Sequence, residues 1–336
     1  MTETTTDTVR ASGRARWRAL HLPSLREALG LIIVYAAIFL ILTATSNNFL
    51  TVQNLRNMLL ATSIMGIVAI FTTMLMVGGG LDLSVGSTIA LSGVVIAILQ
   101  EPLGIWPAAA AGLLAGGLVG VLNGVMVTGI GINPVIATLG MLYVARGMAL
   151  VLADGLTIPV FHESFAELGS ARLAGIPLPV LIFFLLLIVG MIVMQYTTYG
   201  RSLYAIGGNE RASFLAALPV SRQRFIAYTL SGLSAGLAGV ILTARLLASA
   251  PTAATGMEFS VIAAVVLGGT SLAGGKGTLL GTLLGVLILG TLNNGMTLMS
   301  LPSDAQQVVQ GAVLLLAIAI DQFRLGNIDI AVLRRG

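Results

Sequence analysis

Side chains suited to bond chemistry are few in this sequence and are not grouped as a catalytic site would require. The chain has no cysteine and two histidines, His21 and His162, which lie far apart. Thiolate sites are therefore excluded, and a histidine metal cluster is not expected. The segment 268–278 is rich in glycine like a phosphate-binding loop, but Thr270 replaces the first glycine of that motif and Lys276 precedes another glycine. We expect no nucleotide site, metal site or enzymatic activity on this chain.

A few polar residues interrupt the apolar segments. Arg146 is a charge inside such a segment, and we favour a structural pairing with a carboxylate or with helix-end carbonyls over a direct functional role. Asp82 and Ser84 lie within GGGLDLSVG, residues 78–86, whose four glycines disfavour a helix and predict a break between two spans. That break either lines or gates a path, or it is a tight interfacial turn.

A path for an uncharged, hydroxyl-rich solute would need neutral polar side chains at membrane depth. Seven amides occur within the apolar segments, and each could equally hold helices together by hydrogen bonds. With Asp82 and Ser84, we take Asn123, Asn133, Asn293 and Gln306 as candidates for the path. The seven amides are Asn123, Asn133, Asn293, Asn294, Gln306, Gln307 and Gln310.

The elements that position these residues are predicted to be membrane-spanning helices. Of the 336 residues, 57% are hydrophobic and 9% are charged, whereas soluble domains carry about 25% charged residues. Ten apolar segments approach or reach the roughly 20 residues that a bilayer requires. The predicted fold class is an all-α polytopic membrane protein with these spans: 29–44, 58–77, 84–99, 107–128, 134–153, 178–196, 225–247, 258–273, 278–298 and 305–323.

The placement of arginine and lysine predicts that both termini are cytoplasmic. If the N-terminus is inside and the ten segments alternate, most basic residues outside the spans fall on the inner side. The chain then consists of a disordered cytoplasmic arm (1–28), one transmembrane domain (29–323) and a cytoplasmic tail (324–336). The longest external loop is 154–177.

Short internal repeats indicate that the transmembrane domain has two related halves, 29–153 and 178–323. The sequence GLDLSV at 80–85 recurs as GMEFSV at 256–261, and VLNG at 121–124 recurs as TLNN at 291–294. Each half holds five spans, and because five is odd the second half enters the membrane inverted. Inverted repeats are a transporter architecture.

The segment 197–224 is a long polar break in the second half and contains four arginines. Its centre has the signals of a short helix, since Asn209 can cap, Glu210 suits the positive end of the helix dipole and Pro219 ends the run after Leu218. We interpret it as a cytoplasmic element that a partner grips. A solvated connector is the alternative.

Several motifs, in order along the chain, resemble the ribose/xylose-type branch of ATP-binding cassette importer permeases, within the branched-chain amino acid and sugar permease superfamily. The resemblance covers roughly residues 30–323. The matching motifs are GGGLDLSVGS (78–87), GVLNG (120–124), NPVIATLG (133–140) with ARG (145–147), YGRSLYAIGGN (199–209), SGLSAGLAG (231–239) and VLGGTSLAGGKGT (266–278).

This resemblance implies a homodimeric permease in the bacterial inner membrane that imports a monosaccharide or related polyol. ATP and Mg²⁺ would reside on two cytoplasmic ATPase subunits, and an external binding protein would deliver the sugar. No nucleic-acid partner is expected. The family's ATPase-coupling helix corresponds here to about 209–220, although Ser213, Ala217 and Pro219 depart from the usual pattern. The expected coupling residues are Asn209, Glu210, Arg211, Phe214, Leu215 and Leu218.

Three other functions would each require sequence features of their own. An ion- or proton-coupled secondary transporter would share the repeat architecture, but ionisable residues within the spans are sparse. An intramembrane enzyme would need a cluster of titratable side chains that the sequence does not indicate. A channel would need a selectivity filter built from charged side chains or backbone carbonyls, and the segments that break the helices show no such sequence.

Overall fold

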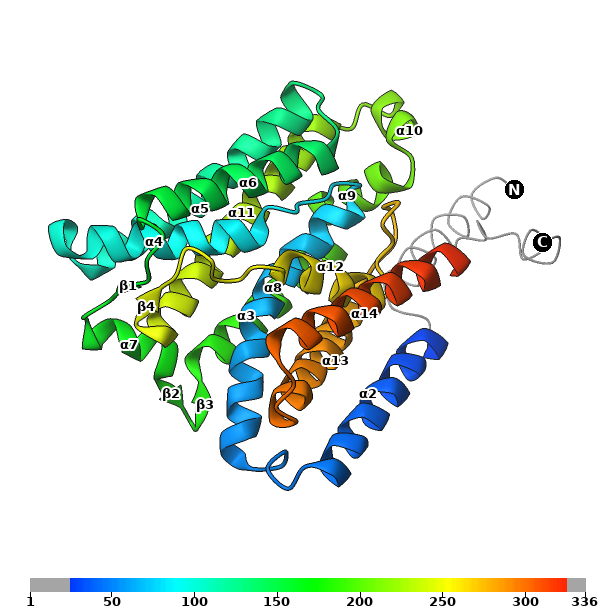
Figure 1. Ribbon diagram of the computed structural model, residues 1–336. Helices are drawn as coiled ribbons and strands as arrows, with labels where there is room; N and C mark the ends of the chain where they lie inside the picture. The colour runs from blue at the N-terminus through cyan, green and yellow to red at the C-terminus, as the bar shows by residue number, and fades with distance from the viewer. Residues whose placement is uncertain (1–24, 325–336) are drawn as a thin grey trace, which may run out of the picture.

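The structure is a computed structural model that describes residues 25–324. The arm and tail expected at the two ends lie almost wholly outside this range. Most of the described chain is helical (Figure 1). The helices are α2 (Leu25–Thr45), α3 (Val52–Val77), α4 (Val85–Leu103), α5 (Ile105–Gly124) with the π-helical extension η1 (Val125–Gly129), α6 (Pro134–Leu152), α7 (Glu163–Ser170), α8 (Leu178–Tyr196), α9 (Thr198–Gly208), α10 (Glu210–Leu215), α11 (Val220–Leu246), α12 (Met257–Leu267), α13 (Leu279–Leu298) and α14 (Ser303–Arg324).

Four two-residue strands belong to the connecting segments. Strand β1 (Ile158–Pro159) pairs antiparallel with β4 (Ala248–Ser249), and β2 (Arg172–Leu173) pairs antiparallel with β3 (Ile176–Pro177). The long connection between α6 and α8 therefore has its own small structure, which includes α7 and three of these strands.

Eight of the described helices are long and apolar enough to cross a membrane: α3, α4, α5 with η1, α6, α8, α11, α13 and α14. The apolar part of α2 and the short helix α12 add two further apolar helices. Each of these helices coincides with one of the predicted apolar segments. The prediction of an all-α polytopic membrane protein is confirmed.

The contacts among the helices repeat between the two halves of the chain. In the first half α4 packs on α5 and α6, and in the second half α12 packs on α13 and α14. Likewise α11 packs on α4 and α5, while α3 packs on α12 and α13. Helices α3 and α11 also contact each other. The repeated motifs both lie at the starts of corresponding helices, although 80–84 precede α4 while 257–261 already form the first turn of α12.

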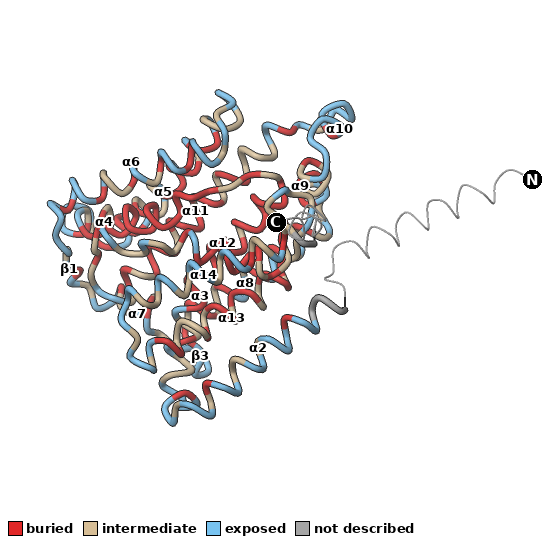
Figure 2. Tube along the Cα trace, turned by 45° about the vertical axis from the view of Figure 1, so that its right-hand side comes forward, coloured by how far each residue is buried: buried red, intermediate tan, exposed pale blue. Residues whose placement is uncertain are grey.

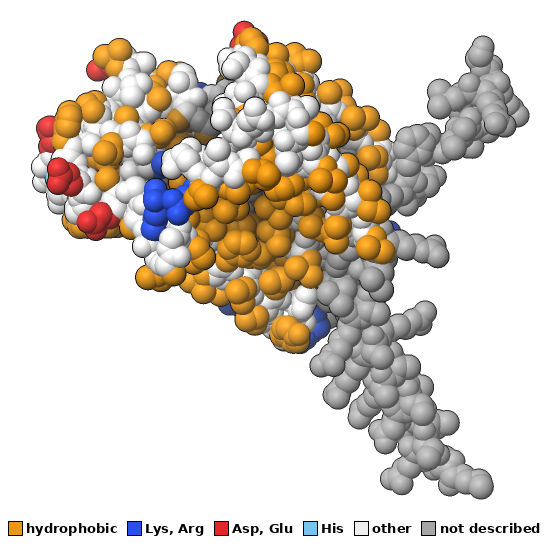
Figure 3. Space-filling view, turned by 90° about the horizontal axis from the view of Figure 1, so that it is seen from below, with side chains coloured by type: hydrophobic (Ala, Val, Ile, Leu, Met, Phe, Trp, Pro, Cys, Tyr) orange, Lys and Arg blue, Asp and Glu red, His pale blue; other side chains and the backbone are white. Residues whose placement is uncertain are grey.

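The core lies where α3, α11 and α12 meet, and Figure 2 shows the buried residues concentrated there. By contrast, only 28% of the residues in the apolar stretch of α6 are buried, and only 6% of those in the apolar stretch of α14. Figure 3 shows hydrophobic side chains over much of the face seen from below. Extended apolar surface of this kind indicates contact with lipid or with another protein chain.

Glycines allow α5 and α11 to cross at backbone contact. A Cβ atom added to Gly116 would lie 2.5 Å from the Cα atom of Gly236, and one added to Gly120 would lie 2.5 Å from the carbonyl oxygen of Tyr228. Close approach of small residues is how helices associate in lipid, where the hydrophobic effect between helices is weak. This crossing fixes α11, whose first turns carry several of the polar residues described below.

Candidate functional site

The polar segment 197–224 contains two helices, of which α9 was not expected. The side chain of Thr197 accepts a hydrogen bond from the Gly200 amide, at 3.3 Å, and begins α9. The Asn209 side chain then caps α10 by accepting a bond from the Ala212 amide, at 2.9 Å, which is the capping that the sequence predicts. An extended Asn209 separates the two helices.

Helix α10 ends at Leu215, earlier than the expected end at Leu218. The cause is Ala217, whose φ of 59° is left-handed. The turn is closed because the Leu218 amide donates to the Ser213 carbonyl oxygen, at 3.0 Å, a common way for helices to end. The chain therefore leaves the helix before Pro219, and proline only follows the stop.

Two large apolar side chains of α10 point away from the rest of the chain. Phe214 is 70% exposed and Leu215 is 78% exposed, whereas Ser213 on the same helix is buried. Arg211 is also exposed, and Leu218 is half-buried just beyond the helix. A short capped helix that holds two apolar residues in solvent has the composition of a protein-binding surface.

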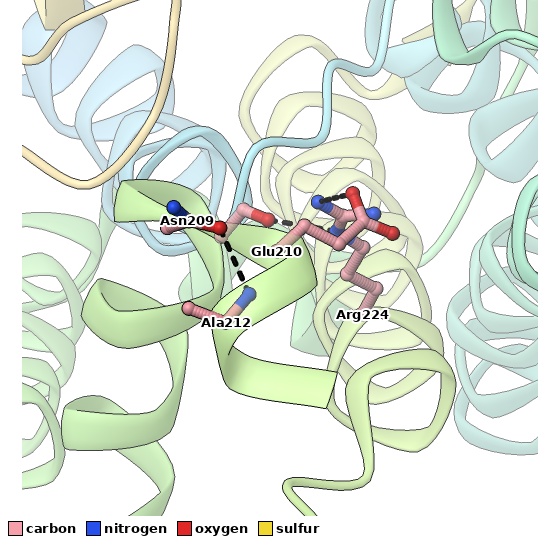
Figure 4. A network of polar contacts seen from close by, with 5 residues as sticks. Asn209, Glu210, Ala212 and Arg224 are labelled. Carbon is pink, nitrogen blue, oxygen red and sulfur yellow. Dashed lines mark hydrogen bonds and ion pairs between the residues drawn. The ribbon is translucent and has the colours of Figure 1, made fainter. Parts of the chain in front are cut away.

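An arginine at the start of α11 fixes the first turn of α10 (Figure 4). Arg224 Nη2 lies 2.8 Å from Glu210 Oε2, and Arg224 Nε donates to the carbonyl oxygen of Gly78, also at 2.8 Å. Gly78 is the residue at which α3 ends. One side chain therefore joins α10, α11 and the end of α3.

Three glycine-containing segments meet beside this arginine, and we call Gly79, Gly207, Gly274 and Gly275 the glycine junction. A Cβ atom added to Gly274 would lie 3.1 Å from the Cα atoms of both Gly207 and Gly79. The Gly275 amide donates to the Val77 carbonyl oxygen at 2.9 Å. No side chain separates these backbones, so the end of α3, the end of α9 and the α12–α13 connection are in direct contact.

A tyrosine of α9 strengthens the contact with the α12–α13 connection. The Tyr204 hydroxyl donates to the Gly277 carbonyl oxygen at 2.8 Å. Burial raises the pKa of Tyr204 to about 12, because the protein interior disfavours the phenolate. The hydroxyl therefore keeps its proton, and this bond, throughout the physiological pH range.

The predicted break between α3 and α4 is present, and Asp82 is its buried centre. Asp82 Oδ1 accepts bonds from the Ser84 amide at 2.9 Å, the Ser84 hydroxyl at 2.6 Å and Asn123 Nδ2 at 3.3 Å. Asp82 Oδ2 accepts from the Ser231 hydroxyl at 2.9 Å. Ser84 stands at the N-cap of α4 without a side-chain capping bond. These four residues, the Asp82 cluster, join the break to α5 and α11.

Arg146 lies within α6 and has a structural pairing, although its partners are backbone carbonyls of the α11–α12 connection and not a carboxylate or the carbonyls at a helix end. Its Nη1 donates to the carbonyl oxygens of Pro251 at 2.6 Å and Ala253 at 2.9 Å. This segment leads into α12, where Glu258 is buried and accepts a bond from the Gly256 amide at 3.2 Å. Arg146 thus holds the connection between α11 and α12.

A cavity of about 450 Å³ lies between α3, α12, α13 and α14, near the end of α3 that is remote from α10. Gln310 Nε2 donates to Asn293 Oδ1 at 3.2 Å, and the Ser260 hydroxyl donates to Gln310 Oε1 at 3.3 Å. Arg245 is the one charged side chain in its lining. Other polar lining residues are Asn57, Thr62, Thr255, Asn294 and Thr297.

The six expected path residues do not form one site. Asp82, Ser84 and Asn123 belong to the Asp82 cluster, and Asn293 lines the cavity. Asn133 is exposed and caps α6 through the Val135 amide, and Gln306 donates to the Leu301 carbonyl oxygen outside the cavity lining.

Three residues of these contacts were not predicted from the sequence as site residues: Arg224, Ser231 and Glu258. Arg224 is one of four arginines in a basic segment, and nothing in that segment marks it as the residue that binds Gly78. Ser231 lies among small residues that suggest packing alone. The repeat offers a partial signal for Glu258, because it occupies the place of Asp82 in the second half.

Comparison with known proteins identifies the family to which this chain belongs. Residues 54–318 match the family described as branched-chain amino acid transport system / permease component. The chain is 41% identical to the ribose import permease protein RbsC of Escherichia coli, over 94% of this chain and 98% of that protein. It is 38% identical to the L-arabinose ABC transporter permease protein AraH of Azospirillum brasilense, over 88% of this chain and 87% of that protein.

A ribose import permease protein RbsC from Bacillus subtilis is 38% identical, over 91% of this chain and 96% of that protein. No solved structure matches the chain. The family match covers most of the sequence, from the first turn of α3 through α13 and most of α14. This chain therefore belongs to the family of branched-chain amino acid transport system permease components, and it is a membrane-embedded transport subunit.

Proposed function

We propose that this chain is the transmembrane subunit of an ATP-binding cassette importer for a monosaccharide or a related polyol. Its relatives are named for ribose import and for L-arabinose ABC transport, and they match it over most of their length. ATP hydrolysis takes place on partner subunits, and an extracytoplasmic sugar-binding protein delivers the solute. The protein resides in the bacterial inner membrane.

The observation that carries this proposal is the exposed apolar pair of α10. Phe214 and Leu215 project from a capped helix that is fixed to the chain by Glu210 and Arg224. A cytoplasmic ATPase would bind this pair, and α10 and both termini would then lie in the cytoplasm. Asn209, Arg211 and Leu218 complete the proposed docking element through the cap, the exposed charge and the closing turn.

A second copy of the chain would cover part of the apolar surface. Helices α6 and α14 occupy corresponding places in the two halves and are the least buried of the long apolar helices. We propose that they form the homodimer contact. The segments 154–177 and 247–258 lie at the end remote from α10 and would meet the sugar-binding protein.

The solute path would include the cavity lined by Asn293 and Gln310, whose polar lining is neutral apart from Arg245. Amides and hydroxyls are suitable groups for a sugar, since they donate and accept hydrogen bonds without the cost of an unpaired charge. The Asp82 cluster lies in the break near α10 and would bound the path on the cytoplasmic side. Closure of the ATPases would displace α10 and open the path to alternate sides of the membrane.

The test is the loss of ATPase binding when α10 becomes polar. Phe214→Asp and Leu215→Asp should insert in the membrane normally but should no longer co-purify with the ATPase, and sugar-stimulated hydrolysis should disappear. Leu50→Asp, which changes an equally apolar, half-exposed position on the α2–α3 connection, is the matched control. Normal co-purification and hydrolysis in both α10 variants would refute the docking role.

The alternative is an ion- or proton-coupled secondary transporter, which would not need the ATPase. Import that continues in cells lacking the ATPase, or that collapses with an uncoupler while ATP is held constant, would favour it. We expect the opposite result in both experiments.

A further inference from the structure

Helix α10 is attached to the membrane helices in a way that a docking surface alone does not require. A docking helix needs only a stable fold and exposed contact residues. Here its preceding helix, α9, ends against the backbones of two other segments at the glycine junction. A Cβ atom on Gly207 would overlap the Val77 carbonyl oxygen, so α9 cannot approach α3 in this way with any other residue there.

Arg224 closes the same junction from the side. Its ion pair with Glu210 is partly exposed, since the two side chains are 17% and 58% accessible, and such pairs add little to stability. Its second bond, from Nε to the Gly78 carbonyl oxygen, is directional and fixes the backbone where α3 ends. A Cβ atom on Gly79 would lie 3.0 Å from Arg224 Nη2, so the guanidinium lies directly on this turn.

The segments that meet at the junction lead directly to transport elements. Gly78 is four residues before Asp82, whose side chain holds the break to α5 and α11. The α12–α13 connection continues into Thr278, which caps α13, and α13 lines the cavity through Asn293. A displacement of α10 therefore reaches the end of α3 and the α12–α13 connection through backbone contacts at the glycine junction, and it reaches the start of α4 through the Asp82 side chain.

We propose that Arg224 and the glycine junction form the rigid link that converts displacement of α10 into rearrangement of the break before α4 and of the α12–α13 connection. Arg224 is a positioning residue in this link: it touches neither solute nor nucleotide. The inference rests on the proposed function, because it assumes that an ATPase moves α10. The inference separates two roles: Leu215 binds the ATPase, and Arg224 couples that binding to transport.

The experiment uses the complete importer, with permease, ATPase and binding protein, in proteoliposomes with ATP inside and labelled ribose or L-arabinose outside. Three quantities are measured: the ATPase that co-purifies, the rate of ATP hydrolysis, and the sugar imported per ATP hydrolysed. The test variants are Arg224→Gln and Gly207→Ala. Their controls are Arg222→Gln, an exposed arginine two residues earlier, and Gly208→Ala, where an added Cβ meets nothing within 4 Å.

Both test variants should retain the ATPase and its unstimulated hydrolysis while import per ATP falls about tenfold, within the range of measured coupling energies. Both controls should resemble the unmodified protein in all three quantities. An unchanged ratio of import to hydrolysis in the test variants would overturn the proposal. Parallel loss of ATPase co-purification would also overturn it, because Arg224 would then serve only the docking surface.

Two further comparisons keep the outcome decisive. If Arg224→Gln does not insert, the pair Gly207→Ala and Gly208→Ala decides alone, since both add one methyl group to adjacent positions. The exchange of Glu210→Arg with Arg224→Glu restores an ion pair but cannot donate to the Gly78 carbonyl oxygen, so coupling should stay low; full recovery would contradict the role of that bond. Failure of the proposed function itself is seen separately, as normal ATPase binding by Leu215→Asp.

Discussion

Arg146 Nη1 donates a hydrogen bond of 2.6 Å to the carbonyl oxygen of Pro251, which joins α6 to the connection before α12. The same nitrogen donates to Ala253 at 2.9 Å. Ala254, Thr255 and Gly256 of this connection line the cavity. An arginine inside an apolar helix therefore has a structural purpose, since it holds one wall of the cavity in place.

Replacing this arginine should destabilise the protein. Arg146→Met keeps an unbranched side chain but leaves two carbonyl oxygens without their charged donor, which should cost about 2 kcal/mol. The measurement is thermal unfolding of the purified permease in detergent. Arg172→Met, which removes an exposed arginine from β2, should leave the midpoint nearly unchanged. Equal midpoints for the two variants would contradict the role assigned to Arg146.

The Asp82 cluster predicts a graded response to substitution. Asp82→Ala leaves Ser84, Asn123 and Ser231 without their common acceptor and should cost about 3 kcal/mol. Asp82→Asn keeps Oδ1, which accepts three of the four bonds. Its new amide group can donate to the Ser231 hydroxyl, because a hydroxyl also accepts.

The asparagine variant should therefore lose about 1 kcal/mol or less, a small part of the alanine effect. Thermal unfolding and the yield of inserted protein measure both variants. If asparagine proves as damaging as alanine, the negative charge itself is required, and the hydrogen-bond account of the cluster is wrong.

The cavity predicts which amides of α14 and α13 affect transport. Asn293→Leu and Gln310→Leu preserve approximate side-chain volume but remove hydrogen-bonding groups from the lining. Each should lower the maximal import rate about tenfold, a loss of roughly 1.4 kcal/mol, while the sugar concentration for half-maximal import, set by the binding protein, stays constant. Import of labelled sugar into proteoliposomes measures both parameters.

Gln306→Leu is the comparison for this prediction, because Gln306 lies on the same helix as Gln310 but outside the cavity lining. It should have a small effect on the import rate. The reverse result, a severe loss for Gln306→Leu with normal import for the two cavity variants, would place the path outside the cavity, beside the α13–α14 connection that Gln306 contacts.

The crossing of α5 and α11 predicts a steric limit at its centre. Gly116→Val would force side-chain atoms into the backbone of α11 and should cost about 3 kcal/mol or more. Gly30→Ala in α2 meets nothing within 4 Å and should be neutral or slightly stabilising, since alanine favours helices. Thermal unfolding in detergent compares them, and a stable Gly116→Val variant would show that the helices do not cross at backbone contact.

The sequence by itself determined the long apolar helices and the interruptions between them. Backbone groups in lipid must be satisfied within their own segment, so long apolar segments separated by glycine-rich or polar residues are sufficient to predict spans. The cap at Asn209 and the break at Gly78–Ser84 were predictable for the same local reason, because they depend on residues close in sequence. The early end of α10 was not, since an alanine at φ 59° has no sequence signal.

Only the tertiary structure decided which distant residues meet. Ser231 lies 149 residues from Asp82, Arg146 lies 105 residues from Pro251, and Arg224 lies 146 residues from Gly78. In a soluble protein the apolar face of a helix shows which side packs inward. In lipid the outward face is as apolar as the core, so the sequence does not mark the packed face, and the neighbours of a buried polar residue appear only once the helices are assembled.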